Sequence, residues 1–560
     1  MITTNKKSVQ QLLDKLWQKG VQHIVISPGS RNAPMILGFT SHDKYTCLSV
    51  PDERVAAFVA LGIADETKQP VALVCTSGSA LLNYYPAIAE AYYRHIPLIV
   101  LSADRPAYLI DQGDGQTIRQ KNVFSNHILY SAELHEAPQN KEDEQENMDR
   151  IQAALRFSKP NMLSNGGPVH LNMPFEEPLY DSEEYQPNVD SSKTIQIAEE
   201  VSNDDVQLIL NLWNHAEKRM ILIGQMDADT ELKESLQGLS PNALILSETT
   251  SNIEIPGVVK NIDRLITPFS EEEKESFQPD ILITFGGNVV SKRIKSVLRS
   301  YQPKNHIHIQ RTSPPLNTYQ CLTHHVEYTP SVFLKAFAKN VNSESSDWVK
   351  HWINLDLSRQ QAHTNYIAKA PYSDLTVIHK ISQLIPDDSI VHLANSTPVR
   401  YAQLLDWKNN LEFKCNRGTS GIDGIVSTAV GNAIASSKQV YLIVGDLSFF
   451  YDTNAWWHRH IPQNIKVIVI NNAGGGIFRF IDGPNSTGQL ENHFETHQKN
   501  SVEHIALGFD VNYLCASNLD MVEEQFKILS TSDQAGILEI TTPQIQNAEI
   551  LKQYFKNLIN

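Results

Sequence analysis

The chain has 560 residues, of which 41% are hydrophobic and 20% charged, and its formal net charge is −16 at pH 7. This length predicts three or four domains of an ordinary globular protein. The negative charge argues against non-specific binding of nucleic acid, although a local cluster of arginines would still bind anionic substrates. No apolar run in the sequence reaches the ~18 residues that a membrane span needs, so no membrane partner is expected.

The N-terminal residues and the cysteines both favour a cytoplasmic protein. Residues 1–7 lack the apolar core of a signal peptide. The five cysteines are scattered without paired spacing, which argues against a zinc site or a disulfide framework. Such usage fits a reducing compartment.

The first third of the chain alternates apolar strands with helices. The expected elements are strands at 21–26, 71–75 and 97–101, and helices at 8–20, 55–64 and 80–93. This βαβαβ order predicts a doubly wound parallel sheet. The turn Ser27–Asn32 follows a strand, and its free amides would suit an anion, with Arg31 as a bidentate donor. The alternative is a plain Pro-Gly turn beside a solvated arginine.

Two apolar runs in the last third end in polar motifs. Val440–Val444 leads into Gly445-Asp446-Leu447-Ser448, and Ile465–Ile470 leads into Asn471-Asn472-Ala473-Gly474-Gly475-Gly476. If these runs are neighbouring parallel strands, Asp446 and Asn472 lie at one carboxyl edge of a sheet. A carboxylate, an amide oxygen and a glycine-rich backbone suit Mg²⁺ held together with substrate phosphates. A tight turn after a strand is the plainer alternative.

The remaining segments are less specific. Residues 201–345 repeat an α/β pattern without a phosphate-binding fingerprint, and an acidic linker is expected over residues 176–200. A second, polar linker is expected near 340–372, followed by a helix at 375–384 and a strand at 389–393. Small polar residues fill Ala394–Arg400 and Cys415–Gly424, where a backbone would approach a diphosphate closely. A strand at 536–540 is expected to close the last sheet.

The Gly-Asp and Asn-Asn motifs at this spacing resemble the signature of thiamine-diphosphate enzymes, with Leu447 in place of the usual second glycine. The resemblance implies an α/β chain of three doubly wound parallel-sheet domains. The expected boundaries are 1–180 for the pyrimidine-binding domain, 200–345 for the central domain and 370–560 for the diphosphate-binding domain. It also implies a homodimer or a dimer of dimers with the active site between subunits.

The same resemblance implies roles for individual residues. Glu53 would be catalytic, because in this family a glutamate at this position bonds a pyrimidine nitrogen of thiamine diphosphate and activates the cofactor; a raised pKa suits that role. Mg²⁺ or Mn²⁺ would be held by Asp446, Asn472 and the carbonyl of Gly474. Ile422, a core residue by default, would prop the cofactor into a bent shape. The further cofactor-binding residues would be Ser396, Gly421, Leu447, Ser448 and Ile477.

Within the family, the segments 27–31, 104–106, 416–424 and 445–448 are similar to a transferase of menaquinone biosynthesis that decarboxylates 2-oxoglutarate and adds the product to isochorismate. The substrate-binding candidates are Ser30, Arg31, Arg105, Gln116, Lys292, Arg293, Arg400, Arg417 and Phe478. A plain surface loop is an equally good interpretation of the Gln116 segment. From spacing alone, Lys292 and Arg293 would be solvated residues at the start of a helix, and only the resemblance makes them substrate-binding candidates. One departure is Gly476, where the pattern has glutamine.

Two alternatives stay open from the sequence. The nearer is another thiamine-diphosphate enzyme, such as a 2-oxoacid decarboxylase or an acetolactate synthase, because this fold alone does not decide the substrate. The farther is a non-catalytic α/β protein that binds a nucleotide through the same glycine turns.

Overall fold

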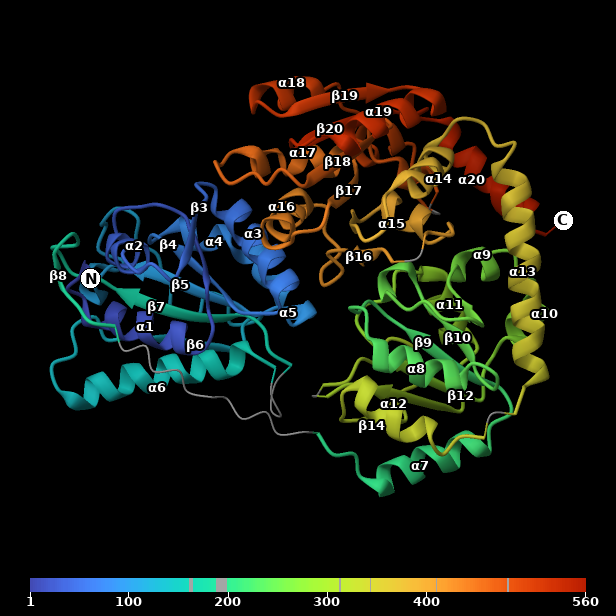
Figure 1. Ribbon diagram of the computed structural model, residues 1–560, viewed down its shortest axis with the longest axis horizontal. Coiled ribbons are helices and arrows are strands. Elements are labelled where there is room, and N and C mark those ends of the chain that lie inside the picture. Colours follow the sequence, from blue (N-terminus) through green and yellow to red (C-terminus); the bar gives the residue numbers. More distant parts are fainter. Residues whose placement is uncertain are drawn as a thin grey trace.

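The structure is a computed structural model that describes residues 1–160, 165–187, 199–311, 314–342, 344–408, 410–480 and 483–559. Within these ranges the chain forms three six-stranded parallel sheets with helices on both sides, as predicted, and one two-stranded antiparallel sheet. Figure 1 shows the first domain at the left, the middle domain at the lower right and the last domain above them. Within the described ranges, none of the helices combines the length and apolar character that a membrane crossing requires.

The first sheet has the strand order β3-β2-β4-β5-β7-β6. Its strands are β2 (His23–Ile26), β3 (Thr46–Ser49), β4 (Val71–Cys75), β5 (Leu98–Asp104), β6 (Tyr130–Glu133) and β7 (Val169–Pro174). Its helices are α1 (Lys7–Gln18), α2 (Ala33–Thr40), α3 (Glu53–Thr67), α4 (Ser79–Asn83), α5 (Tyr85–Arg94), α6 (Lys141–Ser158) and the short 3₁₀ turn η1 (Ala107–Leu109). The single helix predicted for residues 80–93 is wrong. Pro86 lacks the N–H that would continue α4, so a new helix begins at Tyr85.

The middle sheet has the order β11-β10-β9-β12-β13-β14. Its strands are β9 (Arg219–Ile223), β10 (Leu244–Leu246), β11 (Val258–Val259), β12 (Ile281–Phe285), β13 (Asn305–Ile309) and β14 (His324–Val326). Its helices are α7 (Asn203–Asn214), α8 (Thr230–Leu239), η2 (Thr249–Ser251), α9 (Ile262–Ile266), α10 (Glu271–Ser276), α11 (Lys292–Ser300) and α12 (Pro330–Ala338).

The last sheet has the order β16-β15-β17-β18-β20-β19. Its strands are β15 (Ile390–Leu393), β16 (Glu412–Lys414), β17 (Val440–Gly445), β18 (Ile465–Asn471), β19 (Asn512–Ala516) and β20 (Gly536–Thr541). Its helices are α14 (Asp374–Leu384), α15 (Thr397–Ala402), α16 (Ile425–Ala435), α17 (Asp446–Tyr451), η3 (Thr453–Trp456), η4 (Gly476–Arg479), η5 (Pro484–Ser486), the π-helix η6 (Leu490–Phe494), α18 (Val502–Gly508), α19 (Leu519–Thr531) and α20 (Gln546–Asn557). β20 does not close the sheet, because β19 pairs with it and forms the edge.

Both predicted linkers contain regular structure. The polar linker near 340–372 is largely the helix α13 (Asp347–Ile367), which runs along the middle and last domains in Figure 1. Its buried residues, among them Trp352 and His363, form a stripe too narrow to reveal a helix in the sequence. In the acidic linker, β8 (Ser182–Glu184) pairs with β1 (Ile2–Thr4), whereas residues 188–198 lie outside the described ranges.

Each parallel sheet has a point near its middle where the chain, after adding strands on one side of the first strand, continues on the other side. This point lies between β2 and β4 in the first sheet, between β9 and β12 in the middle sheet, and between β15 and β17 in the last. Loops diverge at such a point and leave a crevice at the carboxyl ends of the strands. These three positions are therefore where the fold favours a ligand or another chain segment.

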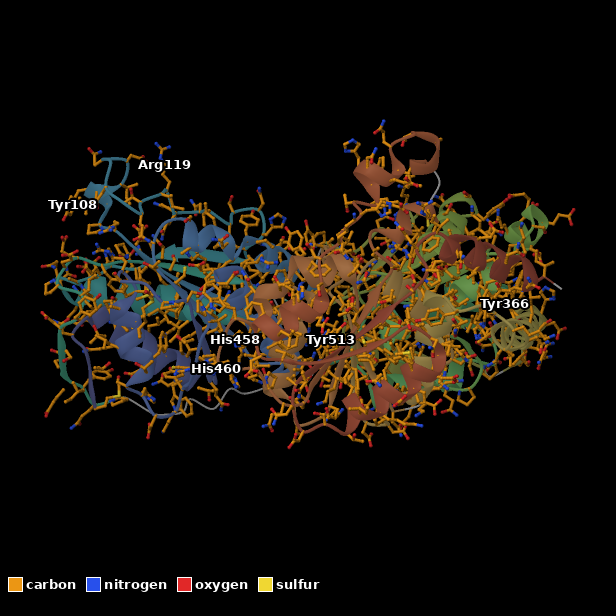
Figure 2. The ribbon with its side chains drawn as sticks, turned by 90° about the horizontal axis from the view of Figure 1, so that it is seen from above. Tyr108, Arg119, Tyr366, His458, His460 and Tyr513 are labelled. Carbon is orange, nitrogen blue, oxygen red and sulfur yellow. The ribbon has the colours of Figure 1, made fainter. Side chains whose placement is uncertain are left out.

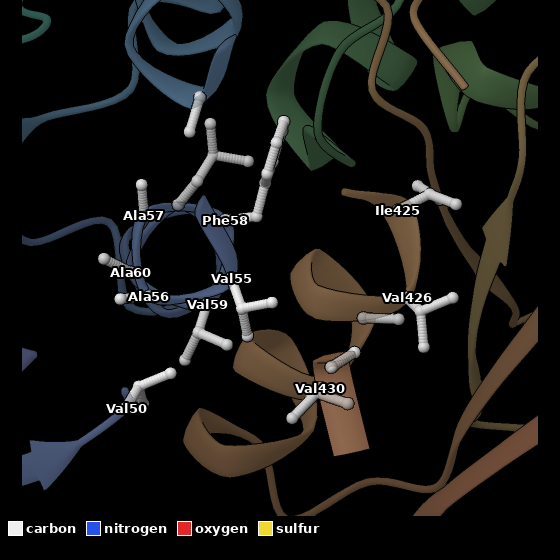
Figure 3. Close-up of a cluster of buried hydrophobic side chains, with 14 of the residues drawn as sticks. Val50, Val55, Ala56, Ala57, Phe58, Val59, Ala60, Ile425, Val426 and Val430 are labelled. Carbon is white, nitrogen blue, oxygen red and sulfur yellow. The ribbon is translucent and has the colours of Figure 1, made fainter. Parts of the chain in front are cut away.

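A shared apolar core joins the first domain to the last through helices α3 and α16. In Figure 3, Val55, Phe58 and Val59 lie on the side of α3 toward α16, whereas Ala56, Ala57 and Ala60 lie on its other side. The two helices approach closely at their glycines. A Cβ on Gly62 would lie 2.1 Å from the backbone oxygen of Thr428, and a Cβ on Gly431 would lie 2.0 Å from that of Val59. Neither helix can carry a side chain there without moving apart.

We therefore expect Gly431→Ala to lower the melting temperature, by about 1–3 kcal/mol of unfolding free energy, through overpacking. Replacing a glycine by alanine inside a helix normally stabilises the protein by roughly 0.5–1 kcal/mol. A net loss of stability in Gly431→Ala would therefore identify the close contact between the two helices. Gly238→Ala in α8 is the matched control, since its Cβ would meet nothing within 4 Å. Equal melting temperatures for the two variants would contradict the close approach.

Candidate active site

The neighbouring strands β17 and β18, beside the reversal point of the last sheet, bring Asp446 and Asn472 to one edge. As predicted, β17 and β18 are parallel neighbours, and Gly445 pairs with Ile470 in their register. Asp446 follows directly after β17, and Asn472 follows directly after β18. The backbone N–H of Gly474 bonds the Asp446 carboxylate, so the three predicted metal-binding residues lie together.

Asp446 is a desolvated carboxylate. Only 2% of its surface is exposed, and burial raises its pKa to about 6. Its Oδ1 accepts the N–H of Leu447 at 2.8 Å, and its Oδ2 accepts the amide of Gln498 at 3.0 Å. A buried carboxylate without a cationic partner favours either a proton or a metal ion.

Asn472 presents an unused acceptor beside it. Its Nδ2 donates to Asp374 Oδ2 at 2.9 Å, and Thr542 donates to the other oxygen of Asp374 at 2.5 Å. Asp374 thereby fixes the orientation of the Asn472 amide and leaves Asn472 Oδ1 buried without a hydrogen-bond partner. A lone buried acceptor is costly unless something else satisfies it. The residues present therefore fit a hard divalent cation.

Glycines shape the segment after Asn472. Gly474 has φ +150°, and a Cβ there would lie 2.7 Å from the backbone oxygen of Glu495. At Gly476, which replaces the expected glutamine, a Cβ would lie 3.1 Å from Asn472 Nδ2. Ile477 and Phe478 follow on η4, half-buried, and the Phe478 ring packs against Phe494 with 5.6 Å between centroids. A side chain at residue 476 would crowd the Asn472 amide.

The loop before α16 lies against the Asp446 turn. Ser448 Oγ donates to the carbonyl of Ile422 at 2.6 Å, and Asn395 Nδ2 donates to the carbonyl of Gly421 at 2.7 Å. Ser396 has φ +76°, which is rare for a residue with a side chain. Ile422 is 37% exposed, so the default prediction of a core residue is wrong and its side chain is free to touch a ligand.

Cations of the middle and last domains converge near this loop. Arg400 Nη1 donates to the carbonyl of Ser396 at 2.6 Å, and Arg417 Nη1 donates to Asn395 Oδ1 at 2.8 Å. Burial, followed by the charge of Arg417, lowers the pKa of Arg400. Such crowding of like charges indicates an anion site.

The middle domain adds to this cluster through α11, whose first two residues are Lys292 and Arg293, both exposed. Burial lowers the pKa of Lys295 in the next turn, and the charges of Arg417 and Lys292 lower it further. Burial raises the pKa of the Asp263 carboxyl, and the charges of Arg293 and Arg400 both lower it in part. The Arg293 guanidinium also lies 4.9 Å from the Phe555 ring centroid.

The first-domain candidates gather at the reversal point of their own sheet. The turn carrying the exposed Ser30 packs against Thr76, and the backbone of Gln116 packs against Gly78. Gln116 is exposed and lies in the chain between Tyr108 and Arg119. Figure 2 shows these two residues on a loop that projects from the first domain. Arg105 Nη2 donates to the carbonyl of Gly115 on this loop at 3.1 Å.

Arg31 is buried, with 5% exposure. Its Nη1 donates to the carbonyl of Phe175 at 2.9 Å, and its Nη2 lies 3.3 Å from Glu177. These bonds hold the end of β7 against the Ser27–Asn32 turn, so Arg31 already has partners inside its own domain.

Glu53 is the first residue of α3, half-buried, and its pKa is raised mainly by burial. Burial raises the pKa values of Cys75 and Tyr84 in the same domain, and the charge of Glu53 raises both further. Its neighbours join the domains instead: Asp52 accepts Asn454 Nδ2 at 2.7 Å, and Arg54 donates to the carbonyl of Tyr451 at 3.1 Å. Among the described residues, no hydrogen bond or ion pair links Glu53 with Asp446 or Asn472.

Sequence reasoning missed three residues that organise the site: Asp374, Asn395 and Gln498. Asp374 looks like a helix start, Asn395 like part of a small polar turn, and Gln498 lies in a segment without a motif. The small polar residues of Ala394–Arg400 could have pointed to Asn395. Asp374 and Gln498 could not be found in this way, because they bond Asn472 and Asp446, which are distant from them in the sequence.

Three doubly wound domains with a metal-suited carboxylate and amide beside a reversal point define an α/β enzyme that binds a diphosphate cofactor. Three family models match in order: "Thiamine pyrophosphate enzyme, N-terminal TPP binding domain" over 6–124, "Middle domain of thiamine pyrophosphate" over 190–393, and "Thiamine pyrophosphate enzyme, C-terminal TPP binding domain" over 396–540. A 4-hydroxybenzoylformate decarboxylase of Rhodococcus jostii, which is thiamine diphosphate-dependent, has the same fold, with a TM-score of 0.70, 16% identity and coverage of 96% and 99% of the two chains.

Two relatives with high sequence identity identify the group within the thiamine pyrophosphate enzymes. The chain is 44% identical to a 2-succinyl-5-enolpyruvyl-6-hydroxy-3-cyclohexene-1-carboxylate synthase of Flavobacterium psychrophilum, with 98% of both chains covered. It is 45% identical to a synthase of the same name from Christiangramia forsetii, with 96% of both covered. The chain belongs to this synthase family of thiamine pyrophosphate enzymes.

Proposed function

We propose that this transferase decarboxylates 2-oxoglutarate and adds the remaining four-carbon unit to isochorismate, which gives 2-succinyl-5-enolpyruvyl-6-hydroxy-3-cyclohexene-1-carboxylate and CO₂ in menaquinone biosynthesis. The observation that carries the proposal is the 44–45% identity to synthases of that product over nearly the whole chain. The cluster of cations supports it, because both substrates are carboxylates. The five free thiols fit a cytoplasmic enzyme.

The cofactor site is proposed on the residues at the edge of the last sheet. Asp446, Asn472 Oδ1 and the Gly474 carbonyl would hold Mg²⁺ or Mn²⁺, and the buried unpartnered oxygen of Asn472 supports that assignment. When bound, thiamine diphosphate supplies a carbon nucleophile and an electron sink for decarboxylation. The surrounding contacts would come from Ser396, Gly421, Ile422, Leu447, Ser448 and Ile477.

The substrate site is proposed on the cations. Arg400 and Arg417 would bind and orient substrate carboxylates, because a fixed guanidinium fork matches a carboxylate in two bonds. The further contacts would come from Ser30, Arg31, Arg105, Gln116, Lys292, Arg293 and Phe478. Arg31 is the weakest of these, since its donors already bond Phe175 and Glu177.

We also propose that the active site lies between the subunits of a homodimer or a dimer of dimers. Among the described residues, no hydrogen bond or ion pair links Glu53 with Asp446 or Asn472 of the same chain, which supports a site completed by the Glu53 of another copy. In that arrangement Glu53 would bond the cofactor and assist its deprotonation.

The test is consumption of isochorismate, followed by its absorbance, with thiamine diphosphate, Mg²⁺ and 2-oxoglutarate present. We expect loss of absorbance that requires every component, because each takes part in the reaction. Replacing 2-oxoglutarate by pyruvate is the control. Turnover of pyruvate without loss of isochorismate would move the function to a 2-oxoacid decarboxylase or an acetolactate synthase.

A further inference from the structure

The segment Cys415–Thr419, which carries Arg417, is held by the middle domain. Gln225 Nε2 donates to the carbonyl of Cys415 at 2.7 Å, and Asn288 Nδ2 donates to the carbonyl of Arg417 at 2.7 Å. Gln225 and Asn288 lie in the turns after β9 and β12, which flank the reversal point of the middle sheet. The crevice that this fold offers to a ligand therefore receives a segment of the last domain instead.

The first domain holds the same segment from another direction, through Glu90 on α5. The Glu90 carboxylate accepts three bonds: from the N–H of Gly418 at 2.9 Å, from the N–H of Thr419 at 2.7 Å, and from Thr419 Oγ1 at 2.9 Å. Gly418 makes this approach possible, because a Cβ there would lie 2.6 Å from the backbone oxygen of Glu90. The contact needs a glycine at this position.

Glu90 is a buried charge, with 1% exposure, so its bonds are not ordinary surface contacts. Arg94 lies 4.0 Å from it and also bonds Asp65 at 3.0 Å. A buried carboxylate is tolerated only when donors and an opposite charge surround it, and charge-assisted bonds are about twice as strong as neutral ones. Loss of the Glu90 charge would thus weaken the bonds to two adjacent N–H groups at once.

One peptide unit concentrates these contacts. The carbonyl of Arg417 and the N–H of Gly418 belong to the same planar group, which is held at its oxygen by Asn288 and at its nitrogen by Glu90. Because that plane is fixed from two domains, the backbone from which the Arg417 side chain departs cannot rotate. The guanidinium is in turn oriented by Asn395 and is 8% exposed.

We propose that Glu90 is a positioning residue that sets the orientation of Arg417 through the Arg417–Gly418 peptide, with Asn288 as its counterpart in the middle domain. Glu90 touches neither substrate nor cofactor in this role. The proposal rests on the proposed function only where Arg417 is assigned to a substrate carboxylate. The orientation of the peptide itself does not depend on that assignment.

The kinetic test uses Glu90→Gln in the holoenzyme, a change that keeps the size of the side chain but removes its charge. We expect KM for the substrate bound by Arg417 to rise roughly 10-fold or more, with kcat altered less than about 3-fold, because misorientation weakens uniform binding. Glu66→Gln is the matched control. Glu66 joins the same domains by accepting Lys414 Nζ at 2.8 Å and Asn432 Nδ2 at 2.9 Å, but it bonds none of residues 416–419. Equal KM values in the two variants would overturn the proposal.

A second measurement is independent of the substrate. Trypsin cleaves after arginine, and a clamped Arg417–Gly418 bond resists it, so Glu90→Gln and Asn288→Ala are both expected to open this site while Glu66→Gln does not. Mass spectrometry of short digests of the holoenzyme identifies the cut. Protection of Arg417 in both variants would overturn the proposal even if the enzyme is active. Cleavage in both would support it even if isochorismate is not the substrate, which separates this inference from the proposed function.

Discussion

Glu53→Gln is expected to reduce kcat by about 10²–10⁴-fold, the range that a positioned acid or base contributes. The substitution keeps the shape of the side chain but removes a half-buried carboxyl whose pKa is raised by burial. The affinity for thiamine diphosphate should change little, because Asp446 and Asn472 are untouched. Steady-state turnover of isochorismate and calorimetric titration with the cofactor measure the two quantities.

Glu142→Gln is the control for this experiment. Glu142 also lies in the first turn of a helix of the first domain, on α6, but it is exposed. Its loss should leave kcat near that of the wild type, as surface substitutions usually do. Wild-type turnover in Glu53→Gln would remove Glu53 from the mechanism.

Asp446→Asn is expected to abolish metal-dependent binding of the cofactor. A ligand present at 100 times its Kd stabilises a protein by about 2.7 kcal/mol, which raises the melting temperature measurably. The wild type should show this rise when thiamine diphosphate and Mg²⁺ are added together. The variant should show no rise in melting temperature, because the Asp446 carboxylate is the charged ligand of the proposed metal site and asparagine has no charge.

Asp520→Asn, an exposed change on α19 of the same domain, should keep the full rise in melting temperature. Mixing the two inactive variants then tests the shared site. If one subunit supplies Glu53 and another supplies Asp446, dimers of Glu53→Gln with Asp446→Asn contain one intact site and regain activity. A rise in melting temperature for Asp446→Asn equal to that of the wild type would contradict the metal site.

The strands that bear the site were predictable because each is buried on both faces and so reads as a continuous apolar run. β4 has the predicted bounds, Val71–Cys75, and β17 and β18 begin at the predicted residues. Two elements that the sequence did not predict, β19 and α13, are only partly buried. β19, with one fully buried residue at its end, and α13, with its narrow buried stripe, leave too weak a pattern in the sequence.

The sequence by itself determined the class of the enzyme and the ligand types at its sheet edge, since Asp446, Asn472 and the glycines follow their strands within a few residues. The tertiary structure alone decided how those groups are oriented. Asp374 turns the Asn472 amide from 98 positions away, and Glu90 reaches the N–H of Gly418 across 328 positions. Such contacts leave no local pattern, because a buried polar group is satisfied by whichever partner the packing of separate domains brings within hydrogen-bond distance.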